Sequence, residues 1–205
     1  MRRVLFLIDG FNVYHALDSQ PHYHKYKWLN YAALARCFIL PDEQIVRILL
    51  FTAYAHWDPN KKRRHKLLIR ALEANGVEVI LGKFKWRDKK CPLCKQWYKT
   101  PEEKRTDVNI ATQLFEAAVN DQFDVAIIIG GDSDLVPAVK AVKKTFPQKK
   151  IGLVIPIGRH AKELAQVCDF RRKMKETHLK LSQLPNTVTI DPAKGVILRR
   201  PPSWT

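Results

Sequence analysis

Residues 125–134 constrain the fold more than any other part of this 205-residue chain. Val125–Ile129 is a short run of mostly β-branched residues, a pattern typical of a strand that is buried on both faces. Two glycines end the run, and a helical spacing of apolar residues begins at Leu135. Asp132 and Asp134 lie between the two patterns, so two carboxylates follow the carboxyl end of a buried strand. Open α/β sheets bind their ligands at that end.

A purely structural interpretation of these acids also exists. Asp132 or Ser133 would cap the following helix, and Asp134 would be a first-turn acid favoured by the helix dipole. The first ten residues argue against it, because residues 4–8 form another apolar run that ends in Asp9 and a glycine. Two buried strands that each end in Asp and Gly indicate one shared site.

Apolar runs alternate with helical patterns along most of the chain. The predicted strands are residues 4–8, 45–51, 77–81, 125–129 and 151–155. This alternation predicts an α/β fold, a Rossmann-like three-layer sandwich in which helices cover both faces of a parallel sheet of about five strands. With the strand order 3-2-1-4-5, the first and fourth strands are neighbours, and Asp9 faces Asp132 across the crevice between them.

The pattern predicts one main domain with two additions. Residues 1–170 form the domain, and residues 82–105 are a basic insertion with little periodicity. A basic C-terminal extension, residues 171–205, contains two short runs of strand character near 187–190 and 195–198.

The charge balance limits the class of partner. The formal net charge is +16, and such an excess most often signals a polyanion. Nucleic acid is the leading candidate and an anionic membrane surface the second. No apolar run approaches the roughly 20 residues of a membrane span, so we expect a cytoplasmic protein whose four cysteines are thiols or metal ligands rather than disulfides.

Two basic segments are candidate substrate-binding surfaces. The first is a predicted helix with consecutive cations at Lys61, Lys62, Arg63 and Arg64, which is either a solvated face or a surface for phosphates. The second is the insertion, where aromatic residues stand among lysines, as in Lys85-Trp86. That combination suits base stacking on single strands, although the aromatic side chains could equally pack a small insertion.

Cys91 and Cys94 have the C-x-x-C spacing of half a zinc site. A structural zinc ion needs four ligands, and the chain has no second C-x-x-C pair. Histidines could complete the site, or a second chain could do so in a homodimer. The alternative is a reduced knuckle that holds no metal. The candidate histidines are His22, His24, His56 and His65.

Three short motifs in this order carry a resemblance to a known family. They are residues 7–12 (Leu-Ile-Asp-Gly-Phe-Asn), residues 104–108 (Lys-Arg-Thr-Asp-Val) and residues 130–134 (Gly-Gly-Asp-Ser-Asp), with a looser match at 200–204. Together they resemble the NYN domain of the PIN-like nucleases, in particular its LabA-like bacterial members. Many of those members carry serine where this chain has Gly130.

The resemblance implies a PIN-like fold and an Mg²⁺ or Mn²⁺ site formed by Asp9, Asp107, Asp132 and Asp134. It also implies that Asn12 supports Asp9 and the substrate phosphate. The position of Asp107 beside Asp132 rests on the resemblance, because the start of a helix and the end of the next strand lie at opposite ends of a tight αβ unit.

The physical chemistry of clustered acids agrees with that implication. Two carboxylates about 4 Å apart repel each other by roughly 4 kcal/mol at an effective dielectric constant near 20. Several in one crevice therefore need protons or a cation, and hard oxygen ligands select Mg²⁺ or Mn²⁺. A metal so held can activate water for attack on a phosphodiester.

We therefore expect a metal-dependent endoribonuclease that acts on single-stranded RNA, with Ser133 added to the substrate-binding residues. A catalytically silent RNA-binding or scaffold protein with the same fold is the alternative. A phosphatase or hydrolase of nucleotides is a third, disfavoured by the basic excess.

Overall fold

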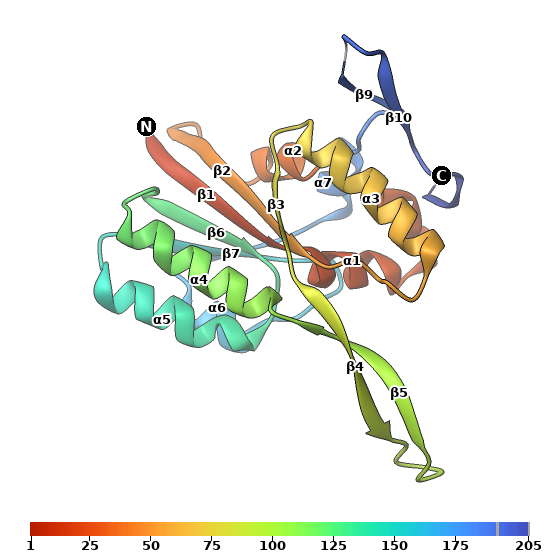
Figure 1. Ribbon diagram of the computed structural model, residues 1–205. Coiled ribbons are helices and arrows are strands. Elements are labelled where there is room, and N and C mark those ends of the chain that lie inside the picture. Colours follow the sequence, from red (N-terminus) through yellow and green to blue (C-terminus); the bar gives the residue numbers. More distant parts are fainter. Residues whose placement is uncertain (192, 205) are drawn as a thin grey trace.

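A six-stranded parallel sheet forms the centre of the computed structural model, which describes residues 1–191 and 193–204 (Figure 1). In spatial order its strands are β3 (Glu78–Leu81), β2 (Glu43–Thr52), β1 (Arg2–Asp9), β6 (Val125–Ile129), β7 (Lys150–Ile155) and β8 (Phe170–Lys173). The five predicted strands thus form the sheet in the predicted order, which confirms the α/β fold. β1 and β6 are neighbours, with Ile8 opposite Ile129.

The sheet has one strand more than the sequence pattern predicted. β8 contains a single aromatic residue followed by three basic ones, so it has no apolar run to reveal it. Its pairing with β7 places the ring of Phe170 over Gly152, where an added Cβ would lie 2.2 Å from the ring. Gly152 is therefore the feature of β7 that accommodates the sixth strand.

Helices cover both faces of the sheet (Figure 1). One face carries α1 (Gly10–Asp18), α2 (Tyr31–Arg36), α3 (Pro59–Glu73) and α7 (Glu176–Leu181); the other carries α4 (Thr106–Val119), α5 (Val136–Thr145) and α6 (Lys162–Val167). Short 3-10 turns lie at η1 (Pro21–Tyr26), η2 (Ser133–Leu135) and η3 (Pro202–Trp204).

β1 shows how the sequence builds the two layers. Phe6 and Ile8 belong to the apolar core on the side of α1 and α2, whereas Leu5 and Leu7 belong to the core on the side of α4 and α5. Successive side chains of a strand point to opposite faces, so a continuous apolar run fills both cores.

The insertion at 82–105 is a two-stranded antiparallel hairpin, β4 (Lys83–Lys90) and β5 (Trp97–Lys104). It projects from the body of the molecule between β3 and α4 (Figure 1). Most of its side chains are exposed on both faces, so no alternation of apolar and polar residues marked it as strands.

The C-terminal region begins inside the sheet rather than beyond it. The predicted domain boundary at 170/171 lies within β8, and Leu179 of α7 is fully buried in the core. The two predicted C-terminal strands form the hairpin β9 (Thr187–Asp191) and β10 (Val196–Arg199), which packs on α3. Within residues 1–191 and 193–204, no helix has the length and apolar character needed to cross a membrane.

Candidate active site

Asp9 ends β1 and caps α1 at the carboxyl edge of the sheet. Its Oδ1 accepts the backbone N–H of Asn12 at 2.9 Å, and only 5% of the residue is exposed. An added Cβ on Gly130, the residue after β6, would lie 3.2 Å from the Cβ of Asp9. The glycine therefore lets the two strand ends approach closely, and burial raises the pKa of Asp9 to about 6 despite the Asn12 hydrogen bond.

Asp132 and Asp134 follow β6 in a short turn. Asp132 caps η2, and its Oδ1 accepts the backbone N–H of Asp134 at 3.0 Å. Asp132 lines the cavity described below and raises the pKa of Asp9, as expected for acids at adjacent strand ends. Asp134 and Ser133 are exposed, and neither of them lines the cavity.

Asp107 enters the same cluster from the first turn of α4. Arg105 precedes it with a φ of 83°, in the left-handed region, and this residue turns the chain from β5 into the helix. The pKa of Asp107 is raised first by burial and then by Asp132 and Asp134. The family resemblance had implied this proximity, and periodicity alone did not.

Glu103 is a fifth acid of this cluster, and the sequence pattern did not reveal it. It lies on β5 opposite Phe84, half-buried, four residues before Asp107. Burial, followed by Asp9, Asp107 and Asp132, raises the pKa of Glu103 to about 8. Its Oε1 is buried and has no hydrogen-bond partner among the described residues.

The oxygen ligands of these carboxyl groups are of the type that binds a hard divalent cation, but their arrangement does not form a complete metal site. No group of three or more His, Cys, Asp or Glu side chains within residues 1–191 and 193–204 is arranged to hold a metal ion. Burial is nevertheless the main cause of the raised pKa values of Asp9, Glu103 and Asp107, and repulsion from neighbouring carboxylates raises them further. A cation bound by the carboxylate oxygens would remove that repulsion.

A cavity of about 990 Å³ lies in front of the acids. Asp9, Glu103, Asp107 and Asp132 form its acidic wall, and Asn12 also lines the cavity. An added Cβ on Gly131 would lie 3.4 Å from Asn12 Oδ1, so the Asn12 amide lies beside the loop after β6. This position agrees with the predicted role of Asn12 beside Asp9, which stays a prediction.

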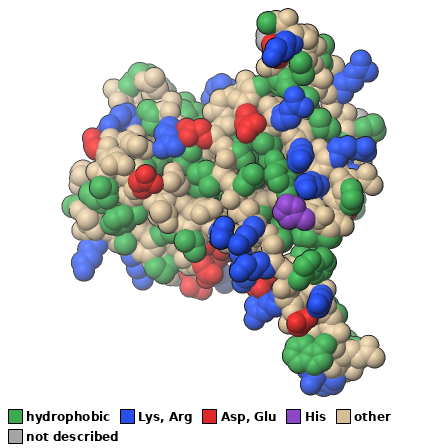
Figure 2. Space-filling view, viewed as in Figure 1, with side chains coloured by type: hydrophobic (Ala, Val, Ile, Leu, Met, Phe, Trp, Pro, Cys, Tyr) green, Lys and Arg blue, Asp and Glu red, His purple; other side chains and the backbone are tan. Residues whose placement is uncertain are grey.

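Positive charge borders the cavity on the side of α3. Lys61, Arg64 and His65 line it from this helix, and Arg159 lines it from the loop after β7. Lys and Arg side chains gather over α3 and at the base of the hairpin (Figure 2). Burial lowers the pKa of His65 to about 4, so its imidazole is neutral at physiological pH.

Aromatic rings form a third side of the cavity. Phe84 meets Phe11 edge-on at 5.3 Å and Trp57 edge-on at 4.7 Å between ring centroids. Trp57 in turn lies 5.9 Å from the ring of Trp86, and both tryptophans are more than one-third exposed. Trp57 was not among the predicted site residues, because nothing near it in sequence marks the loop between β2 and α3.

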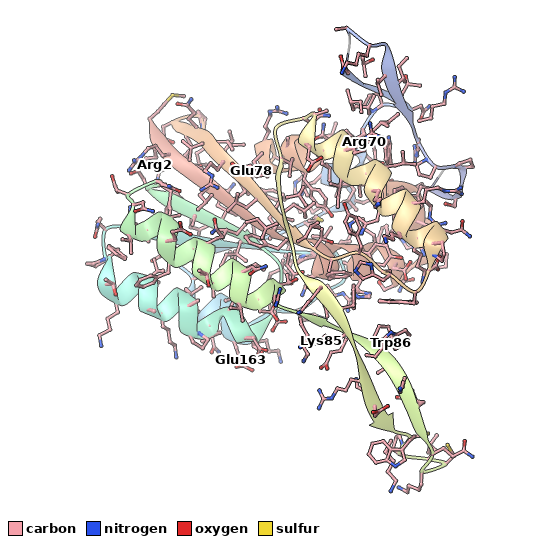
Figure 3. All side chains as sticks on the ribbon, viewed as in Figure 1. Arg2, Arg70, Glu78, Lys85, Trp86 and Glu163 are labelled. Atoms are coloured by element: carbon pink, nitrogen blue, oxygen red, sulfur yellow. The ribbon has the colours of Figure 1, made fainter. Side chains whose placement is uncertain are left out.

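Five of the predicted substrate-binding residues do not line the cavity. Lys62 and Arg63 are on α3 but do not line the cavity, unlike their neighbours Lys61 and Arg64. Lys85 and Trp86 project from opposite sides of β4 near the base of the hairpin (Figure 3). Lys85 lines a smaller depression of about 530 Å³ that is rich in cations, whereas Ser133 is exposed and lines neither hollow.

Glu103→Gln is expected to stabilise the protein at pH 8 in the presence of EDTA and to change little at pH 5. The folded pKa is raised, so between about pH 4.5 and 8 the native protein holds a proton that the unfolded chain has released, and stability falls as the pH rises through this window. Glutamine cannot ionise, so the variant does not lose stability in this way. After a discount for solvent screening, we expect roughly 1–2 kcal/mol, or about 3–6 °C in Tm, by differential scanning fluorimetry.

Glu102→Gln is the matched control for that measurement. Lys104 and Arg87 hydrogen-bond to the Glu102 carboxylate and lower its pKa, so its charge favours the fold. Its neutralisation should give no gain in Tm at pH 8. Equal gains from both substitutions would contradict the assignment of uncompensated charge to Glu103.

Comparisons with known proteins agree with the fold. A 6-hydroxy-3-succinoylpyridine 3-monooxygenase, HspA of Pseudomonas putida, is 25% identical to this chain, and the match covers 98% of this chain and 75% of that protein. The crystal structure of a protein of unknown function from Vibrio parahaemolyticus matches 85% of this chain and 94% of its own, with 20% identity and a TM-score of 0.56. The NYN domain profile matches residues 3–173. This range contains all six strands of the central sheet, apart from Arg2 at the start of β1. The chain therefore belongs to the NYN domain family.

Proposed function

We propose that this protein is a metal-dependent endoribonuclease that hydrolyses phosphodiester bonds of single-stranded RNA. The observation that carries the proposal is the convergence of Asp9, Glu103, Asp107 and Asp132 at one cavity, where burial and then neighbouring carboxylates raise the pKa values of Asp9, Glu103 and Asp107. Nuclease activity is general in the NYN domain family, and this cluster lies at the sheet edge where such folds bind ligands.

Mg²⁺ or Mn²⁺ is the proposed cofactor. Asp9, Asp107 and Asp132 would hold it, with Asp134 at the rim and Glu103 as an added ligand or proton carrier. When bound, the ion supplies an activated water and a counter-charge for the phosphate in the transition state. The oxygen-only donor set and the unpartnered Glu103 Oε1 support this choice.

The chain's own residues would bind and orient the RNA. Lys61 and Arg64 offer phosphate contacts beside the acids, and Asn12 offers an amide next to Asp9. Trp57 and Trp86 present partly exposed rings on which unpaired bases can stack. Stacking of this kind requires bases that are free of a complementary strand, which favours single-stranded RNA.

Lys62, Arg63 and Lys85 would extend the phosphate path beyond the cavity. Positive charge continues over α3 and the base of the hairpin (Figure 2). This area exceeds what a small molecule can contact, so a polymer explains it better than the pyridine derivative in the name of the Pseudomonas relative. We place such an activity in the cytosol, where the four cysteines would stay reduced.

The test is incubation of end-labelled single-stranded RNA with the purified protein in Mn²⁺, Mg²⁺ or EDTA. We expect internal cleavage with a divalent ion, none in EDTA, and slower cleavage of a duplex of the same sequence. Tight binding without cleavage in either metal would support the alternative, a silent RNA-binding or scaffold protein. If the protein neither binds nor cleaves the RNA, both the ribonuclease proposal and the RNA-binding alternative are contradicted.

A further inference from the structure

The tip of the β4–β5 hairpin folds tightly around one cysteine. The backbone N–H of Cys91 donates to Gln96 O at 2.8 Å, and the N–H of Lys95 donates to Cys91 O at 3.0 Å. Lys95 has a φ of 59°, in the left-handed region, which lets the chain reverse directly after Cys94. Both thiols are therefore held within one turn.

Both thiols of this turn are accessible, since Cys91 is partly exposed and Cys94 is exposed. They have the C-x-x-C spacing that zinc sites use. Thiolate is the form of cysteine that binds metal ions. The turn thus provides two potential sulfur ligands for one metal ion.

The same chain does not complete a metal site at this tip. Cys37 and Cys168 lie in the body of the protein, where they pack against the two cores of the sheet. Within the residues that the structure describes, no third His, Cys, Asp or Glu joins Cys91 and Cys94 as a ligand set. The hairpin points away from the body (Figure 1), so the missing ligands must come from outside the chain. Structural zinc sites have four ligands.

A second copy of the chain supplies the required ligands in the required number. Two identical tips related by a two-fold axis bring four sulfurs together, the ligand set of a structural zinc site. Leu93 is 91% exposed and Trp97 is 68% exposed, and contact between two tips would cover such apolar side chains.

The charge of the tip also fits this arrangement. A zinc ion with four thiolates carries a net charge of about −2. Lys90 and Lys95 lie at the tip, so two copies place four cations around that anionic centre. This local attraction opposes the repulsion expected between two chains of net charge +16.

We propose that Cys91 and Cys94 form one half of a zinc site that the same two residues of a second copy complete. Zn²⁺ then joins two chains tip to tip, and its binding releases the thiol protons to solvent. The proposal is independent of the ribonuclease activity, since the tip lies beyond the cavity and its lining residues.

The test uses full-length protein that is reduced, loaded with Zn²⁺ and desalted. We expect one zinc ion per two chains by elemental analysis and twice the chain mass by light scattering. The double variant Cys91→Ser and Cys94→Ser should retain no zinc and have the mass of one chain. The matched variant Cys37→Ser and Cys168→Ser should keep both the metal and the dimer.

A measurement on the unsubstituted protein tests the same proposal even if the variants fold poorly. Zn²⁺ should protect Cys91 and Cys94 from iodoacetamide and should leave the labelling of the other two cysteines unchanged. One zinc ion per monomer, or no retained zinc, would overturn the proposal. Ready formation of a Cys91–Cys94 disulfide in zinc-free protein that also fails to bind zinc would identify a redox dithiol instead.

Discussion

Asp132→Asn is expected to slow RNA cleavage by at least about 100-fold and to leave RNA affinity unchanged or slightly tighter. The carboxylate is proposed to act on the transition state, where a loss of several kcal/mol corresponds to a factor of this size. Asparagine keeps an oxygen that can accept the Asp134 N–H, so the turn into η2 should be preserved. Single-turnover cleavage and filter binding of the same RNA measure the two effects separately.

Asp42→Asn is the matched control for that change. Asp42 is exposed, pairs with Arg2 and precedes β2 at the opposite end of the sheet from the cavity. Both substitutions remove one carboxylate charge, yet only Asp132→Asn should affect cleavage. In EDTA, Asp132→Asn should also raise Tm slightly, since the loss of this charge relieves repulsion on Asp9, Glu103 and Asp107. If Asp132→Asn cleaves RNA at the rate of the unsubstituted protein, Asp132 is not part of the active site.

Charge reversal of Lys61 and Arg64 is expected to weaken RNA binding roughly 10- to 100-fold at about 0.1 M salt. The two side chains line the cavity, and each lost phosphate contact should reduce the slope of log K against log salt by about 0.7 for a single strand. Glutamate is a good helix former, and at position 61 it lies in the first turn of α3, where the helix dipole favours an acid, so the fold should be kept. Binding titrations at several salt concentrations give both quantities.

Lys62→Glu with Arg63→Glu provides a control with the same change in net charge. Neither residue lines the cavity, so their reversal should remove only phosphate contacts that lie farther from the acids. We expect the smaller loss of affinity from this pair. Equal losses from the two double variants would show that RNA follows the whole helix rather than its cavity side.

The sheet and two of its acids were predictable because they rest on short-range signals. Each buried strand is a continuous apolar run, and Asp9 and Asp132 directly follow such runs. Parallel pairing of β1 with β6 then brings the two residues to one edge. β8 escaped prediction, since its stability comes from pairing with β7 and from the packing of Phe170 on Gly152.

Glu103 and Trp57 could not be inferred from local pattern. Glu103 reaches the acids because the hairpin strand β5 runs back to the sheet edge, and an exposed hairpin leaves no periodicity from which to deduce that course. Trp57 joins the cavity through contacts with Phe84 and Trp86, which lie more than 25 residues away in sequence. Such long-range contacts depend on the fold itself.

The neutral histidines of the cavity define the sharpest test of the proposed chemistry. His15 and His65 have lowered pKa values, chiefly through burial, and offer a metal-free alternative in which a base activates the 2′-hydroxyl of the RNA. That route leaves a 2′,3′-cyclic phosphate, whereas attack by a metal-activated water does not require the 2′-hydroxyl.

The decisive measurement is therefore the chemistry of the RNA ends produced in Mn²⁺ and in EDTA, determined by mass spectrometry of a single-stranded oligonucleotide. Our account predicts cleavage only with the divalent ion, with linear phosphate and hydroxyl ends, and it predicts that replacing the 2′-hydroxyl at the cut site does not block the reaction. Cleavage that persists in EDTA and leaves 2′,3′-cyclic phosphates would contradict it.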